Sequence, residues 1–243
     1  MATPDAIAAF LLRDVNRAIS AHDLIVDGDR VAVGVSGGKD SRTLLDLLVR
    51  GVDIPGRYEV VAFHVDGTEV GLPDQTQELI PWFEALDVPY EILPIQVPDD
   101  EPLPMGCFRC AWNRRKTLFI AAERRGCNKV ALGHHADDAA ATALLSLMYK
   151  GKLESLAPRR PYFGGVLEMI RPLLLLTERE IRRYARAHAW MMPDEPACPH
   201  GQETRRTKVE GFLASLPRRE RRQVRANLIR AALASVLGEE EGA

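Results

Sequence analysis

The chain has 243 residues, of which 46% are hydrophobic, so it is long enough to fold around one substantial core with a small appendage. Its formal net charge of −2 excludes a protein that is basic throughout. The apolar runs are too short to span a bilayer and the first residues lack the basic start of an export signal, so we expect a cytoplasmic protein with no membrane partner.

Apolar periodicity predicts an alternation of helices and strands along the chain. The pattern begins with a helix over residues 5–21, a strand over 30–35 and a helix over 41–49. It continues with strands over 58–65, 90–97 and 129–134, a helix over 74–86 interrupted at Pro81, and helices over 110–126 and 137–151. A hairpin turned at Gly164 and Gly165 and three helical patterns follow, over residues 161–170, 177–189, 203–216 and 218–237.

This order of elements predicts right-handed βαβ units and therefore an α/β fold with a doubly wound parallel sheet. We expect an N-terminal helix over 1–24, an α/β domain over 25–172 and a helical C-terminal extension over 173–243. Residues 204–230 carry nine Lys or Arg against two acids. That region is either a surface for a polyanion or a solvated helix face.

The segment VAVGVSGGKDS, residues 31–41, is typical of a phosphate-binding loop, because a strand ends in glycines that open a helix. The spacing excludes the P-loop, since only three residues separate Gly34 from Gly38 and Asp40 follows Lys39; the dinucleotide fingerprint is absent as well. Glycine at positions 37 and 38 allows the backbone to approach a phosphate, and Asp40 is suited to Mg²⁺. Hydrogen-bond donors for the phosphates are Ser36, Lys39 and Ser41.

A second polar segment, GHHADD at residues 133–138, ends the fourth predicted strand and opens a helix. Doubly wound sheets bind ligands at this edge. Asp137 and Asp138 are candidates for Mg²⁺ or for orienting the substrate, although acids at a helix start are also favoured by the helix dipole. His134 and His135 are candidates for contact with phosphate.

Cysteine spacing indicates a metal or catalytic role, because a reducing compartment disfavours disulfides. Cys107 and Cys110 form C-x2-C at the start of a predicted helix, and Cys198 lies much further along the chain. Three thiolates would hold a 4Fe–4S cluster with one open iron, whereas His200 would complete a closed Cys3His zinc site. Spacing alone favours neither set, and Cys127 is more typical of a small buried side chain.

The segment SGGKDS, residues 36–41, resembles the loop of the PP-loop ATP pyrophosphatases. Over about residues 18–216 the chain resembles one branch of that family, the tRNA 2-thiocytidine synthetases. The segments that carry this resemblance are GDRVAVGVSGGKDSRTLLDLL, CFRCAWNRR, KVALGHHADDAAATALLSLMYKGKLESLAP, IRPLLLLTEREIRRYARA and CPHGQ. It departs from the family at VDG (residues 65–67), where LDQ is usual, and at the missing second C-x-x-C near Cys198.

The resemblance implies a function: ATP is split between its α- and β-phosphates with Mg²⁺, AMP is placed on a cytidine oxygen in the tRNA anticodon stem-loop, and sulfur displaces it. It implies a 4Fe–4S cluster on Cys107, Cys110 and Cys198. It also implies a nucleotide site made of Val35, Ser36, Gly37, Gly38, Lys39, Asp40, Ser41, His64, Val65, Gly133 and Asp138. The catalytic candidates are Asp40, Asp137, Cys107, Cys110 and Arg115.

The partners implied are tRNA, a sulfur donor such as a cysteine desulfurase or sulfide, and a second copy of the chain in a homodimer. Arg114, Arg115 and Lys116 are candidates for contacts with RNA phosphate or with the adenylate, and the C-terminal arginines with residues 149–152 for sequence-independent RNA contacts. Three other functions remain open. They are a sulfur-independent adenylating ligase or amidotransferase, a nucleotide-binding sensor or redox protein, and a sulfurtransferase for a small molecule.

Overall fold

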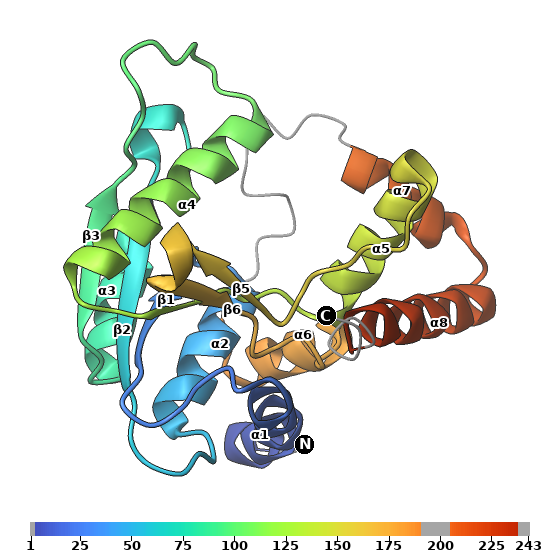
Figure 1. Cartoon of the computed structure of the whole chain (residues 1–243), viewed down its shortest axis with the longest axis horizontal. Coiled ribbons are helices and arrows are strands. Elements are labelled where there is room, and N and C mark those ends of the chain that lie inside the picture. The colour runs from blue at the N-terminus through green and yellow to red at the C-terminus, as the bar shows by residue number, and fades with distance from the viewer. Residues whose placement is uncertain (1–2, 191–204, 238–243) are drawn as a thin grey trace.

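The computed structural model describes residues 3–190 and 205–237 of the chain (Figure 1). Six strands form one sheet in the order β3-β2-β1-β4-β6-β5. The first half of the chain comprises α1 (Pro4–His22), β1 (Arg30–Gly34), α2 (Lys39–Arg50), β2 (Glu59–Asp66), η1 (Thr68–Val70), α3 (Thr76–Ala85), β3 (Tyr90–Pro94) and α4 (Cys107–Arg124). The second half comprises β4 (Lys129–Ala131), α5 (Ala136–Lys150), β5 (Arg159–Tyr162), η2 (Phe163–Gly165), β6 (Leu167–Ile170), α6 (Glu178–Ala187), α7 (Arg205–Ser215) and α8 (Arg218–Leu237).

The sheet confirms the predicted doubly wound α/β fold. Strands β3, β2, β1, β4 and β6 run parallel, so their carboxyl ends meet at one edge. The edge strand β5 is antiparallel to β6 and forms the predicted hairpin with it. Its turn contains Gly164 and Gly165 at φ of 67° and 93°, a left-handed conformation that glycine adopts without steric cost.

Two hydrophobic layers cover the sheet. Helices α1, α2, α3 and α6 pack on one face, where Leu44, Phe83 and Tyr184 are fully buried among strand residues such as Val33. Helix α4 covers the other face with Leu118 and the residues that follow it. Helices α5, α7 and α8 lie together beside the sheet (right side of Figure 1), and a small apolar cluster joins α5 to α8. These layers leave the carboxyl edge of the parallel strands accessible, and the candidate nucleotide site lies at that edge.

Three boundaries differ from the sequence-based expectation. Helix α3 is continuous through Pro81, so the predicted interruption is wrong; burial of Leu79 and Phe83 on either side holds the helix together despite the one missing backbone donor. Helix α4 begins at Cys107, capped by Gly106, and so includes the whole C-x2-C motif. Strand β4 ends at residue 131, before the GHHADD segment.

The predicted metal ligands Cys198 and His200 lie outside the described residues. Within the described ranges, every helix is too short or too polar to cross a bilayer.

Candidate nucleotide site at the carboxyl edge of the sheet

The loop between β1 and α2 is held in shape by its own serines and glycines. The Ser36 N–H donates to Ser41 Oγ over 3.1 Å, and Ser41 Oγ donates to the Gly38 carbonyl over 3.0 Å. Gly37 has φ of 86°, and a Cβ there would lie 2.6 Å from Gln75 Oε1, so only glycine fits. The first turn of α2 lies beside the loop and lines a cavity with Asp40 and Ser41, and a helix start of this kind favours an anion.

A second layer of side chains supports this loop from behind. Arg42 Nε donates to the Gly37 carbonyl over 3.0 Å, and the same guanidinium pairs with Glu78 at 2.7 Å. His64 Nδ1 contacts the Val35 carbonyl at 2.8 Å, and burial lowers the pKa of its imidazole. A neutral His64 therefore donates to the loop backbone, which is a supporting role; it is Val65 that lines the cavity in front.

A cavity of about 350 Å³ lies between this loop and α4. Its volume falls at the small end of ligand pockets. Its apolar lining residues are Phe63, Val65, Leu118 and Leu132. Its polar lining residues are Ser36, Asp40, Ser41, Arg114, Arg115, His134 and Asp138. A cavity that combines apolar side chains with arginines and hydroxyl groups suits a nucleotide, which offers both an apolar base and phosphates.

Asp40 has the geometry of a Mg²⁺ ligand. Its Oδ1 is buried without a hydrogen-bond partner, and its Oδ2 lies 3.1 Å from Lys39 Nζ. The Oδ1 oxygen accepts no hydrogen bond within the described residues, although His135 Nε2 lies 3.6 Å from it, and such a carboxylate beside a phosphate loop fits a hard cation. Gly133 keeps this part of the site compact, because a Cβ there would lie 2.9 Å from the carbonyl carbon of Asp40.

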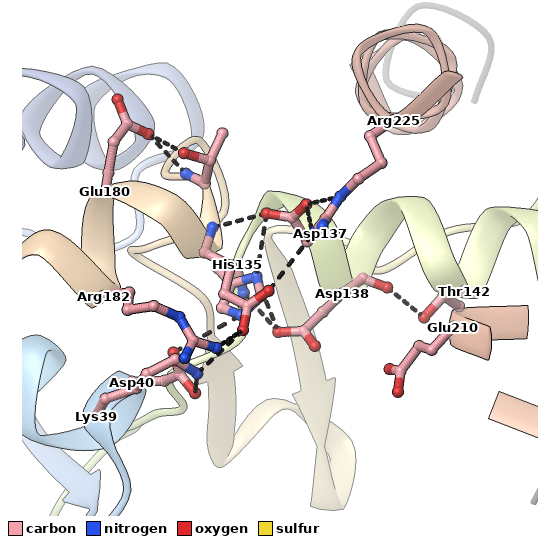
Figure 2. A network of polar contacts seen from close by, with 12 residues as sticks. Lys39, Asp40, His135, Asp137, Asp138, Thr142, Glu180, Arg182, Glu210 and Arg225 are labelled. Carbon is pink, nitrogen blue, oxygen red and sulfur yellow. Dashed lines mark hydrogen bonds and ion pairs between the residues drawn. The ribbon is translucent and has the colours of Figure 1, made fainter. Parts of the chain in front are cut away.

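Asp137 and Asp138 are instead engaged by the C-terminal half of the chain, and Figure 2 shows the contact between Asp137 and Arg225. Asp137 accepts hydrogen bonds from the Glu178 N–H over 2.7 Å and from Arg225 Nε over 2.8 Å. Asp138 accepts the His135 N–H over 2.9 Å, in a helix-capping arrangement, and pairs with Arg206. Asp137 is therefore poorly placed as a Mg²⁺ ligand, and Asp40 is the stronger candidate.

Glu178 links the phosphate loop to these C-terminal contacts, and no sequence motif marks it. Its carboxylate lies 3.6 Å from Lys39 Nζ, 2.8 Å from Arg182 and 3.4 Å from Arg225. Burial alone would raise the pKa of Glu178, but the hydrogen bond from Arg182 and the charges of Lys39 and Arg182 outweigh burial and hold that pKa at about 2. The residue is the first of α6, where an acid is expected for the helix dipole, so the sequence carries no signal for its second role.

A buried arginine to which the sequence assigns no role, Arg171, fixes the protonation of His134. Its Nε donates to His134 Nδ1 over 3.3 Å. Burial lowers the pKa of Arg171 to about 10, which leaves it charged at neutral pH. Burial and the charge of Arg171 together lower the pKa of His134 to about 4. His134 is therefore a neutral imidazole whose hydrogen sits on Nε2, ready to donate to a ligand in the cavity.

The two described cysteines of the predicted cluster lie in the first turn of α4. Their spacing places Cys107 and Cys110 on the same face of the helix as Ala111 and Arg114, which line the cavity. No group of three or more His, Cys, Asp or Glu that could hold a metal ion occurs within residues 3–190 and 205–237. Two soft thiolate donors on one helix face fit iron or zinc once a third ligand from elsewhere in the chain completes the set.

The other residues proposed around the cysteines are placed differently. Arg115 lines the cavity with Arg114, whereas Lys116 is exposed and lies over the ring of Trp112 at 5.5 Å. Cys127 is buried in the core under α4, where burial raises the pKa of its thiol, as expected of a structural side chain.

Comparison with known proteins identifies the family to which the chain belongs. The PP-loop domain family matches residues 11–196. The chain is 37% identical over 230 residues to the tRNA-cytidine(32) 2-sulfurtransferase of Anaeromyxobacter sp. strain Fw109-5, covering 91% of this chain and 74% of that protein. It is 34% identical over 209 residues to the enzyme of the same name from Shewanella sp. strain ANA-3, covering 84% of this chain and 67% of that protein.

Among solved structures, the fold is similar to that of the U34-tRNA thiolase NcsA from Methanococcus maripaludis with its [4Fe-4S] cluster. The two superpose with a TM-score of 0.73 at 20% identity, over 96% of this chain and 80% of that one. The fold and the loop thus define an ATP-binding protein of the PP-loop class. Within that class, the chain belongs to the family of the tRNA-cytidine(32) 2-sulfurtransferases.

Proposed function

We propose that the chain is an ATP-dependent tRNA sulfurtransferase that replaces the C2 oxygen of a cytidine with sulfur. The relatives from Anaeromyxobacter and Shewanella, by their name, act on cytidine 32 of tRNA. The observation that carries the proposal is the position of Cys107 and Cys110 on the same face of α4 as the cavity of the phosphate loop. The relatives do not favour a sulfur-independent ligase or a small-molecule substrate.

The first half of the reaction activates a poor leaving group. The C2 oxygen of the pyrimidine attacks the α-phosphorus of ATP, the bond to the β-phosphate oxygen breaks, and pyrophosphate leaves. The loop backbone and Lys39 hold the departing pyrophosphate, because they are donors already fixed in place. The Nε2–H of His134 and the Arg115 guanidinium donate to the α-phosphate oxygens, and Asp40 would hold the Mg²⁺ that neutralises phosphate charge.

In the second half of the reaction, sulfur adds to C2 and AMP departs with the original oxygen. Cys107, Cys110 and Cys198 would hold a 4Fe–4S cluster, which when bound supplies an open iron able to carry sulfur from a donor such as a cysteine desulfurase or sulfide. The described residues contribute by position: the cysteines lie on the helix whose Arg114 and Arg115 line the nucleotide cavity.

The test combines cluster content with nucleoside analysis. Anaerobically purified protein should be brown, and Cys110→Ala should lose both the visible absorption and 2-thiocytidine formation in tRNA. Cys127→Ala is the matched control, since its thiol is buried in the core and should be dispensable. Unchanged 2-thiocytidine in tRNA from a deletion strain would reject the function, and a colourless protein with stoichiometric zinc would reject the cluster.

A further inference from the structure

A groove of about 1060 Å³, separate from the nucleotide cavity, lies between α6 and α8, with Ile7 of α1 at its edge. Both helices line it with arginines at helical spacing i, i+3, i+4 and i+7, so each contributes a continuous stripe. The stripe on α6 consists of Arg179, Arg182, Arg183 and Arg186. The stripe on α8 consists of Arg218, Arg221, Arg222 and Arg225.

Three of these arginines are committed to contacts within the protein. Arg182 pairs with Glu178, Arg225 pairs with Asp137 and Glu178, and Arg221 donates to backbone carbonyls at the end of α7. These contacts also engage both acids that line the groove.

Five arginines are left over, and none of them has a carboxylate partner in the part of the chain that the structure describes. They are Arg179, Arg183, Arg186, Arg218 and Arg222, and all five are exposed.

This arrangement does not serve the stability of the helices. Like charges at i+3 and i+4 cost about 0.2–0.5 kcal/mol per pair, and an ordinary solvated face would alternate them with acids. The chain as a whole has a net charge of −2, so the excess of arginine is local to this groove. A local cationic groove of this kind is expected to bind a polyanion.

The chemistry of the groove favours the backbone of a nucleic acid over its bases. Guanidinium forks match phosphate oxygens, and the described residues that line the groove include no aromatic side chain on which a base could stack. The groove also adjoins the nucleotide site, because Asp137 and Glu178 line it and also line the space beside Lys39 and Asp40. A strand held here would keep the rest of the same RNA close to the phosphate loop.

We infer that the groove between α6 and α8 binds the phosphate backbone of a tRNA stem through these five arginines, independently of sequence. The inference rests on the proposed function, since it assigns the surface that holds the substrate of that reaction. The target cytidine would reach the separate cavity at α4. The groove would then provide affinity for the tRNA, and the cavity would carry out the chemistry.

The test compares two triple variants with equal loss of charge. Arg179→Ala, Arg183→Ala and Arg186→Ala together remove the three arginines of the α6 stripe that have no carboxylate partner among the described residues. Exposed Arg57, Arg124 and Arg125, replaced by Ala together, form the control. The control residues precede β2 or end α4, which places them at the amino edge of the sheet, opposite the site. Binding of an unmodified tRNA transcript is measured by fluorescence anisotropy between 50 and 300 mM salt, on the order of the range where phosphate contacts dominate.

The α6 variant should bind tRNA at least tenfold more weakly than the control, and the slope of log K against log salt should fall by about 0.7–0.9 for each phosphate that the variant no longer neutralises. Its KM for tRNA should rise while kcat and Mg²⁺-ATP affinity stay unchanged. Equal affinity for tRNA and equal salt slope in the two variants would reject tRNA binding by the groove, even if thiolation proceeds normally. Salt-dependent binding through the groove without any 2-thiocytidine product would overturn the proposed function and leave the groove standing.

Discussion

Replacing Gly133 by alanine should damage the nucleotide site by displacing backbone against backbone. The added Cβ would lie 2.9 Å from the carbonyl carbon of Asp40 and 3.0 Å from the Ser41 nitrogen, whereas ordinary contacts begin at 3.4 Å. The first turn of α2 and the segment after β4 must therefore separate by about 0.5 Å. A misplacement of about 1 Å costs on the order of a hundredfold in rate, so half of it should cost roughly tenfold in kcat/KM for AMP formation.

The same clash should lower the free energy of unfolding by about 1–3 kcal/mol, because neither backbone segment can move without strain. Urea unfolding and tRNA-dependent AMP release measure the two effects on one preparation. Gly211→Ala is the matched control: nothing lies within 4 Å of its new Cβ, and inside α7 alanine should stabilise by about 0.5–1 kcal/mol. If Gly133→Ala leaves both kcat/KM and stability at wild-type values, the close packing of the two segments does not position the site.

Three further changes separate the roles assigned to the site residues. Asp137→Asn removes an ion pair with α8 and should lower the free energy of unfolding in urea by about 1–2 kcal/mol. Asp40→Asn should change that free energy by less than about 0.5 kcal/mol, yet lower the rate of Mg²⁺-dependent AMP formation at least a hundredfold. The opposite pattern would make Asp137 the metal ligand. The pKa of His134 is about 4 in the folded chain and 6.5 in the unfolded chain, so between these pH values only the unfolded chain binds the proton. The free energy of unfolding should therefore rise with pH across that window, by up to about 3 kcal/mol. Urea unfolding of His134→Gln at several pH values should lack this rise. Gly37→Ala should weaken Mg²⁺-ATP binding, because the φ of residue 37 is 86° and Gln75 clashes with the new Cβ. Adding Gln75→Ala should recover only the affinity lost to the clash, leaving about 1–2 kcal/mol of backbone strain. Wild-type affinity in the double variant, measured by equilibrium dialysis, would exclude the strain.

Most of the fold and the phosphate loop could be predicted because their signals are local. The strand, the glycines and the helix that opens at Lys39 are contiguous, and their geometry depends on bonds within a few residues, such as that between Ser36 and Ser41. That Cys107 and Cys110 share a face of α4 with Ala111 and Arg114 likewise follows from helical periodicity, once α4 is known to line the cavity.

The partners of the acidic residues could not be predicted, because they come from elements far apart in the chain. Asp137 at the start of α5 looks like a metal ligand in the sequence, but Arg225 of α8 occupies it from 88 residues away. The same holds for Arg171, which follows β6 and, together with burial, lowers the pKa of His134 after the neighbouring strand β4. No periodicity or spacing encodes which carboxylate a distant arginine will reach.

These long-range pairs also explain how the helical C-terminal region is tied to the nucleotide site. Arg225 and Arg206 reach from α8 and α7 to consecutive acids on α5, and Glu178 connects Arg225 to Lys39 of the phosphate loop. Displacing α8 would leave Asp137 and Glu178 partly buried with fewer cationic partners, which is costly. The arginine groove is therefore held in a fixed position relative to the loop. The ion pairs that anchor α7 and α8 therefore also fix where an RNA bound in the groove lies relative to the ATP site.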